Sequence, residues 1–360
     1  MAEKKRLDYI DWLKAIGIFL VVLGHCLPAY TLLRTVIYSF HVPLFAFAGG
    51  LLAKAPKSWR ELSKSLLRLL TRLGAPYLIW YLVSCIPYMV KNCPFKTDYG
   101  FWELVKIFFL LGGRPNWNAA LWFIPCYFIV SLIFLLVSFI ARGNKYIVLG
   151  VGGASFLGII TLECFDKTIN AFGFTNIFSA HNVLLLFGFF AVGFCLSKPI
   201  KHLATIKENP RKNYILYIAL GVFVSSLVVS ALVNRDPSRP GGYFGLSVLN
   251  LNYNNIFIYI PIALIIITSL TLALALLPSF NVARMMSQSS FFIMSAHYFF
   301  FLSKFHTSPS WKAGKWESAL HLGMREGVFI AVLFIAVLFV LYAIRNRVKW
   351  FNKALYYFGI

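Results

Sequence analysis

Long apolar runs, separated by short charged segments, dominate this sequence. Ten windows of this kind lie at 10–30, 36–53, 74–90, 119–140, 146–162, 182–196, 214–233, 256–277, 291–302 and 327–344. A helix needs roughly 17–25 residues to cross a bilayer, and the shorter windows can borrow flanking residues. The pattern predicts an all-α integral membrane protein, a bundle of about ten transmembrane helices.

The composition excludes an ordinary soluble protein. Hydrophobic residues make up 59% and charged residues 13% of the chain, against about 45–50% and about 25% in soluble domains. The net charge of +22 would indicate nucleic acid binding in a soluble domain. Here the cations lie between apolar runs, as in loops that face anionic lipids. We therefore expect membrane lipids as partners and no nucleic acid.

The positions of the cations predict the topology. Basic residues cluster before the first window, in the segments 54–72 and 198–212, and in the tail 345–353, which marks these segments as cytoplasmic. Two cytoplasmic loops must be joined by an even number of spans. The short window 101–111 is therefore expected to lie in the outer interface as an amphipathic or re-entrant piece. Both termini are then cytoplasmic, and residues 1–360 form a single membrane domain.

The first window carries ionisable residues, which are costly in a bilayer and so are candidates for function. Lys14 and His25 are eleven positions apart, which is about 1100° of helix rotation and about 16 Å along the axis. They share one face, with Lys14 near the cytoplasmic end and His25 in the outer half. Asp11 could pair with Lys14. Alternatively, Lys14 reaches the inner headgroups and His25 bonds a neighbouring helix.

Other candidate residues lie near the ends of later windows. His41 is expected at the outer end of the second window, either functional or as an interfacial cap; Pro43 suits a first helical turn, and Gly49-Gly50 permits close helix approach. Trp122 stands where an aromatic belt would be. His297 lies inside a window and is a candidate of second rank. The cysteines and histidines show no spacing that predicts a metal site.

Three cations follow the second window at four-residue spacing: Lys64, Arg68 and Arg72. This spacing places them on one helix face at the inner surface. Lipid headgroups would explain such a face, and so would a soluble phosphate-bearing ligand. The spacing alone favours lipid.

These segments together resemble the membrane-bound acyltransferase 3 family, particularly its fucose 4-O-acetylase-like branch. The resemblance rests on LDYIDWLKA (7–15) leading to VLGH (22–25), on YSFHVPLF (38–45), RLGAPYLIW (72–80) and LWF (121–123), and on the run that ends at His297. It implies ten spans in the cell (inner) membrane of a bacterium. It also implies an acyl-CoA donor, usually acetyl-CoA, on the cytoplasmic side and a hydroxyl acceptor, such as a glycan, reached from the outer side.

The resemblance further implies roles for individual residues. The family motif of Arg or Lys, ten residues, and His maps onto Lys14 and His25. The basic residues that hold the CoA phosphates map onto Arg72 and Arg68, with Lys64 beside them; the family often has Arg-x-x-Arg here, whereas this chain has one residue more. Asp11, His41 and Trp122 would support the site. CoA is a substrate here, and no tightly bound cofactor is implied.

Two mechanisms and one other class of function stay open at this point. His25 could remove the proton of the acceptor hydroxyl, or it could first accept the acyl group itself. A transporter or flippase for a glycan or lipid could instead line its path with Lys14 and His25. The sequence shows no inverted repeat. One basic cluster facing one buried histidine suits a two-substrate enzyme better.

Overall fold

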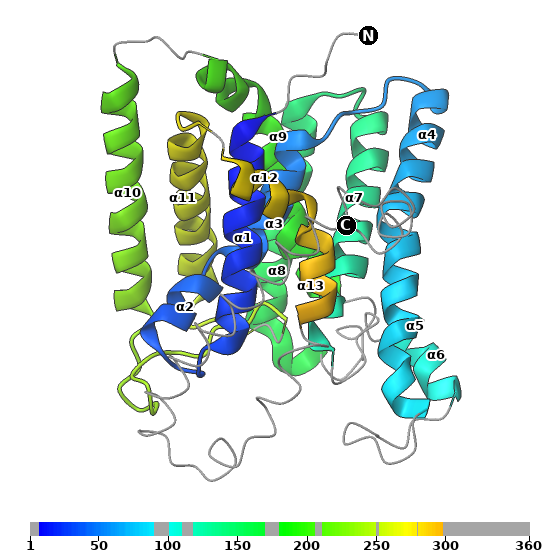
Figure 1. Ribbon diagram of the computed structural model, residues 1–360, viewed down its shortest axis with the longest axis horizontal. Helices are drawn as coiled ribbons and strands as arrows, with labels where there is room; N and C mark the ends of the chain where they lie inside the picture. The colour runs from blue at the N-terminus through cyan, green and yellow to red at the C-terminus, as the bar shows by residue number, and fades with distance from the viewer. Residues whose placement is uncertain are drawn as a thin grey trace. The chain divides into compact units, whose positions relative to one another are not determined.

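The computed structural model describes residues 7–89, 101–109, 118–169, 180–205, 211–249, 252–278 and 280–297 (Figure 1). The regular elements of this part are helices and two isolated β-bridges, Arg235–Tyr243 and Ser247–Asn252. The elements are α1 (Asp8–Cys26), α2 (Leu32–Tyr38), α3 (His41–Leu52), α4 (Trp59–Leu69), the π-helix η1 (Leu70–Gly74), α5 (Ala75–Met89), α6 (Phe101–Phe109), the 3-10 helix η2 (Ala119–Trp122), α7 (Phe123–Ile140), α8 (Lys145–Ile169), α9 (Ala180–Thr205), α10 (Lys212–Val233), α11 (Ile256–Ala275), α12 (Asn281–Gln288) and α13 (Ser290–His297).

The described helices confirm a polytopic helical membrane protein. Eight helical stretches within the described residues are long and apolar enough to cross a bilayer. They are Asp8–Cys26, Leu32–Leu52, Trp59–Ile86, Ala120–Ile140, Lys145–Cys164, His181–Ala204, Lys212–Val233 and Ile256–Ala275. Each overlaps one of the first eight predicted windows, but the third begins at Trp59, within the segment 54–72 that was expected to be a cytoplasmic loop. The window 291–302 is described only as far as His297, and 327–344 lies outside the described residues. The count of ten and the orientation stay predictions.

The short window 101–111 does not form a span in the described structure. Residues Phe101–Phe109 form α6, about 13 Å long at 1.5 Å per residue, less than half of the roughly 30 Å hydrocarbon core. The hydroxyl of Tyr81 donates to the carbonyl of Leu104 at 2.5 Å and ties α6 to α5. Glu103 and Lys106 form an ion pair at 3.7 Å on the exposed face of α6.

The chain divides into two compact units. The first contains Met1–Ala53, Phe189–Ser290 and Leu320–Val328; the second contains Lys54–Gly188, Phe291–Ala319 and Phe329–Ile360. The single domain over residues 1–360 stays a prediction. Asp11, Lys14, His25 and His41 belong to the first unit, whereas Lys64, Arg68, Arg72 and Trp122 belong to the second.

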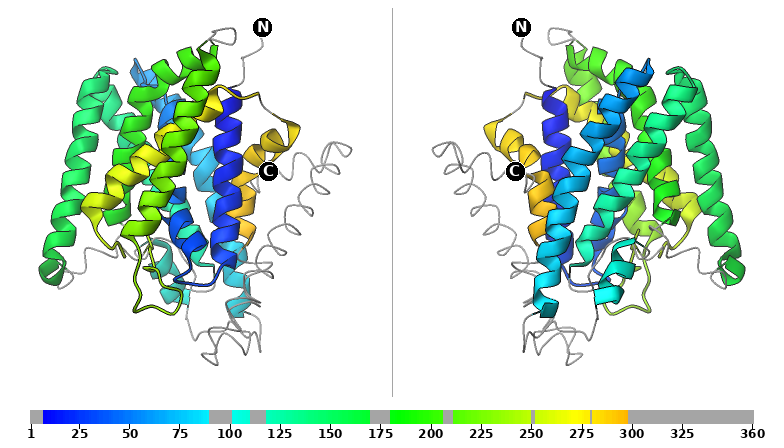
Figure 2. Two further views of the ribbon diagram at one scale, coloured as in Figure 1. Left: turned by 90° about the vertical axis from the view of Figure 1, so that its left-hand side faces the viewer. Right: turned by 90° about the vertical axis from the view of Figure 1, so that its right-hand side faces the viewer.

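In the first unit, α1 packs against α2, α3, α11 and α12, and α10 runs beside α11 (Figure 2). Two glycines bring α3 and α9 into backbone contact. A Cβ atom on Gly50 would lie 2.0 Å from the carbonyl oxygen of Phe190, and one on Gly193 would lie 2.2 Å from that of Phe47. Small residues permit such approach between membrane helices. The close approach predicted from Gly49-Gly50 is therefore confirmed at Gly50.

In the second unit, α4 and η1 pack against α7, and α7 packs against α8. Trp59 at the start of α4 meets Phe139 near the end of α7 edge to face, with ring centroids 4.7 Å apart. The helix α4 begins after Ser58, whose hydroxyl accepts from the Glu61 backbone N–H, while the Glu61 carboxylate accepts from the backbone N–H of Lys57. This reciprocal arrangement resembles a capping box and fixes where the basic helix starts.

Candidate active site

Lys14 and His25 lie on one uninterrupted helix. Since α1 runs from Asp8 to Cys26 without a break, their predicted separation of about 16 Å along the axis holds. Both side chains are half-buried, and Asp11 is buried. The indole N–H of Trp12 donates to the carbonyl of Pro278 at 2.8 Å and holds this half of α1 beside α12. The pairing of Asp11 with Lys14 stays a prediction.

The imidazole of His25 contacts Tyr38, the last residue of α2. The Tyr38 hydroxyl lies 3.3 Å from His25 Nδ1, and the two rings meet edge to face. Gly24 makes this contact possible, because a Cβ atom there would lie 2.8 Å from Tyr38 Cε2. Leu23 of α1, Leu27 directly after it, Ile37 and Leu246 complete a buried apolar cluster around the Tyr38 ring. His25 is therefore held at the edge of a packed cluster.

His41 lies on the same tyrosine. Its ring centroid is 4.7 Å from that of Tyr38, and its side chain is 2% exposed. His41 Nδ1 is 2.9 Å from the carbonyl oxygen of Ile37; because a carbonyl can only accept, Nδ1 carries the proton. His41 thus satisfies a backbone group at the break between α2 and α3, which agrees with its alternative interpretation as a cap.

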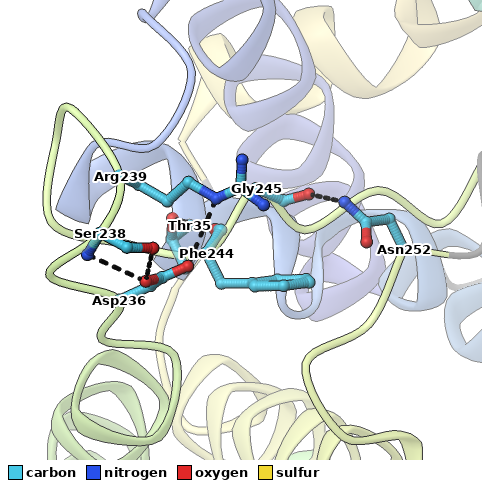
Figure 3. A network of polar contacts seen from close by, with 7 residues as sticks. All are labelled: Thr35, Asp236, Ser238, Arg239, Phe244, Gly245 and Asn252. Atoms are coloured by element: carbon cyan, nitrogen blue, oxygen red, sulfur yellow. Dashed lines mark hydrogen bonds and ion pairs between the residues drawn. The ribbon is translucent and has the colours of Figure 1, made fainter.

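Part of the loop between α10 and α11 packs over the corner between α1 and α2 (Figure 3). The Thr35 hydroxyl donates to the carbonyl of Phe244 at 3.0 Å, and the Asn252 amide donates to that of Gly245 at 2.7 Å. Gly241 touches the backbone of Tyr30, where a Cβ atom would lie 2.1 Å from the carbonyl oxygen. This loop therefore covers the end of α1 that carries His25.

Acid is expected to loosen this loop. The Asp236 carboxylate accepts from the Ser238 hydroxyl at 2.5 Å and from Arg239 Nε at 3.3 Å. The hydrogen bond from Ser238, together with Arg239, holds the pKa of the Asp236 carboxyl below its usual value. Because the pKa is lower in the folded loop than in the unfolded chain, the ionised carboxylate stabilises the folded loop at pH values above the unfolded-state pKa. This stabilisation disappears as the pH falls through the folded-state pKa. Hydrogen exchange of residues 235–245, corrected for the intrinsic rate, should rise with acidification.

The variant Asp236→Asn provides the comparison, because it lacks the charge at every pH. We expect its loop amides to exchange faster than those of the wild type at pH 7, while the α11 amides exchange equally in both proteins. Equal loop exchange at pH 7 would contradict the proposed role of the Asp236 carboxylate.

The predicted cations of the second unit lie on an exposed basic helix. Lys64 and Arg68 stand one turn apart on α4, Arg72 follows in η1, and all three side chains are exposed. A π-helical turn holds one residue more than an α-helical turn and often marks a functional site. The regular spacing predicted from the sequence therefore holds between Lys64 and Arg68, and Arg72 follows in a wider turn.

Trp122 ends η2 and is buried. Its side chain is 6% exposed and meets Phe123 edge to face at 5.9 Å. A tryptophan of an aromatic belt faces the lipid interface, whereas Trp122 is buried.

Two polar contacts are not evident from the sequence. Tyr38 belongs to a segment that carries the family resemblance, but no residue spacing predicts its contact with His25. Asn118 donates to the Ser84 hydroxyl at 3.0 Å and to the Ser295 carbonyl at 3.2 Å. It is fully buried, and its Oδ1 has no hydrogen-bond partner among the described residues. The sequence signal that could have indicated Asn118 is its position directly before the apolar window 119–140.

The predicted residues therefore fall into two groups. Within the first unit the structure brings His25 and His41 onto Tyr38, while Lys14 and Asp11 lie nearer the other end of α1. Within the second unit it places Lys64, Arg68 and Arg72 along one helical segment, and Trp122 lies elsewhere, in η2. His297 is buried at the end of α13, with Nδ1 2.9 Å from the carbonyl oxygen of Ile293.

Comparison with known proteins identifies the family. No curated protein and no solved structure matches the chain. The family model described as an acyltransferase domain matches residues 7–345, so the match includes α1 with Lys14 and His25 as well as the basic helix. Together with the membrane-spanning helices, this match favours an acyltransferase over a transporter or flippase. The chain belongs to the acyltransferase 3 family and is a membrane acyltransferase.

Proposed function

We propose that this protein transfers an acetyl group from cytoplasmic acetyl-CoA to a hydroxyl group of a glycan or related acceptor on the outer side of the cell (inner) membrane of a bacterium. The observation that carries the proposal is the arrangement of α1, where His25 is held against Tyr38 about three turns from Lys14 on the same helix. The sequence resemblance to the fucose 4-O-acetylase-like branch supports a sugar hydroxyl as the acceptor.

The donor is proposed to bind through its phosphates. Lys64, Arg68 and Arg72 are exposed and follow one another along α4 and η1. Cationic donors and phosphate oxygens form charge-assisted hydrogen bonds, which are about twice as strong as neutral ones. The extra residue between Arg68 and Arg72, compared with the family's common spacing, falls next to the π turn. This turn supplies room for that residue within a continuous helix.

The reaction needs one proton acceptor and one leaving group. In the direct route, the acceptor hydroxyl gives its proton to His25, its oxygen attacks the thioester carbonyl, and the C–S bond breaks to release the CoA thiolate. In the covalent route, His25 attacks the thioester carbonyl and the C–S bond breaks to release the CoA thiolate; the acceptor hydroxyl then attacks the acyl group on His25, the N–C bond breaks, and the freed imidazole takes the hydroxyl proton. Lys14 is proposed to contact the donor, with Asp11 holding it in place. His41 and Trp122 are proposed to support the site by packing.

Removal of one phosphate contact should weaken donor binding. We expect Arg72→Ala to raise the Kd for radiolabelled acetyl-CoA by about tenfold, because one charge-assisted hydrogen bond is lost at an exposed site. The measurement is saturation binding to the purified protein in detergent. High salt should weaken wild-type binding in the same direction.

The matched control is Lys145→Ala, which removes an exposed cation at the start of α8 in the same unit. Its Kd should equal that of the wild type. Absence of saturable binding by the wild type would refute the donor assignment. An equal increase of Kd in both variants would mean that the basic helix attracts acetyl-CoA only through its general positive charge.

A further inference from the structure

We propose that Tyr38 positions His25, with its hydroxyl oxygen accepting the Nδ1–H of the imidazole so that Nε2 keeps its lone pair for the reaction. The inference rests on the proposed function for the identity of the reacting base. Tyr38 comes from α2 and His25 from α1, and the contact joins the Tyr38 hydroxyl to His25 Nδ1 at 3.3 Å. Nothing in the local sequence of α1 provides this contact.

The direction of the hydrogen bond follows from what a base requires. A neutral imidazole carries one N–H, and the partner of one nitrogen decides the state of the other. If the tyrosine donated to Nδ1, the proton would sit on Nε2, and Nε2 could accept neither a proton nor an acyl group. With Nδ1–H donating to Tyr38, Nε2 is the basic atom. A tyrosine hydroxyl accepts as readily as it donates.

The ring of Tyr38 is fixed on several sides, so its hydroxyl is held in place. The Arg34 guanidinium lies over one ring face, 4.9 Å from the centroid, and is itself tied to the carbonyl of Leu27 at 3.2 Å. The ring of His41 lies 4.7 Å away, and Gly24 brings the backbone of α1 against the ring edge. Tyr38 is 8% exposed. Groups fixed in this way lose little entropy when they orient a catalytic side chain.

The test compares Tyr38→Phe with the wild type in the full chain. Phenylalanine keeps the ring packing and removes only the hydroxyl. The first readout is carbethoxylation of His25 by diethyl pyrocarbonate at pH 7, followed by peptide mass spectrometry, which needs neither acetyl-CoA nor an acceptor. We expect roughly 2- to 10-fold slower modification, which corresponds to one net hydrogen bond. The second readout is acetyl-CoA hydrolysis, for which kcat should fall by a similar factor at unchanged KM.

Tyr9→Phe is the matched control on α1, because the Tyr9 hydroxyl is buried and has no hydrogen-bond partner among the described residues; it should leave both readouts at wild-type values. Gly24→Ala provides a second test, since the added Cβ would displace the Tyr38 ring. It should slow the modification of His25 as Tyr38→Phe does.

The outcomes separate this inference from the proposed function. Slower modification of His25 in both variants supports the positioning role. If the wild type then shows no acetyl-CoA turnover, the proposed function fails and the positioning of His25 stands. Modification of His25 at the wild-type rate in Tyr38→Phe would overturn the inference, whatever the turnover.

Discussion

Replacement of His25 by alanine is expected to lower the turnover of acetyl-CoA by about 10²- to 10⁴-fold, the usual contribution of a positioned general base. The loss follows under either route, because the same nitrogen accepts the hydroxyl proton in one and the acyl group in the other. Binding of acetyl-CoA should stay within a factor of about two of the wild type, because the proposed phosphate contacts are made by other residues. Turnover is measured as release of radiolabelled acetate by the purified protein in detergent.

The control for this prediction is His202→Ala, which removes an exposed imidazole in the last turn of α9. We expect wild-type turnover from it. Wild-type turnover from His25→Ala would show that His25 takes no part in the chemistry. Rapid quenching of the wild type, followed by mass spectrometry, would also separate the two routes, because only the covalent route forms an acetylated His25 peptide.

His41 is a weaker candidate for the base than His25, for a geometric reason. Its side chain is 2% exposed, whereas His25 is half-buried. A base must reach the proton that it removes. His41 therefore fits a structural role at the junction of α2 and α3, where it also packs against the tyrosine that contacts His25.

The spans could be predicted because hydropathy is a local property of about twenty residues. Breaks and wide turns inside a span depend on contacts with residues that are distant in the sequence. The window 36–53 predicts a span with Pro43 in a first helical turn, which α3 from His41 confirms. Hydropathy does not reveal that α2 ends at Tyr38 just before it, or that the imidazole of His41 satisfies a carbonyl at the break. Likewise, the π turn at Leu70–Gly74 leaves the apolar pattern unchanged, so a hydropathy window does not detect it.

Part of the candidate site could also be predicted. Lys14 and His25 stand out because charged and titratable groups are rare in apolar runs, and the helix period places them on one face. Tyr38 could not be found in this way. Its contact with His25 depends on the turn between α1 and α2 and on the missing side chain of Gly24, and both are visible only in three dimensions.

The contact between α3 and α9 should be the most sensitive packing point of the first unit. Gly193→Ala is expected to destabilise the protein by about 1–3 kcal/mol or more, because its Cβ would meet the backbone oxygen of Phe47, which cannot move aside as a flexible side chain can. The midpoint of thermal unfolding in detergent, followed by tryptophan fluorescence, should fall. Gly221→Ala in α10 is the control: among the described residues, nothing apart from its neighbours on α10 lies within 4 Å of its Cβ position, and alanine favours a helix by up to about 1 kcal/mol relative to glycine.

The same contact links stability to activity. Because α3 begins at His41 beside Tyr38, a shift of α3 would move the ring that contacts His25. Gly193→Ala should therefore slow the carbethoxylation of His25 as well as lower the unfolding temperature. In the same contact, the Cβ of Gly50→Ala would meet the backbone of Phe190. The double variant should therefore lose less free energy of unfolding than the sum of the losses in the two single variants. Additive losses of unfolding free energy would mean that the two glycines act at independent contacts. Equal unfolding midpoints for Gly193→Ala and Gly221→Ala would contradict the backbone contact between α3 and α9.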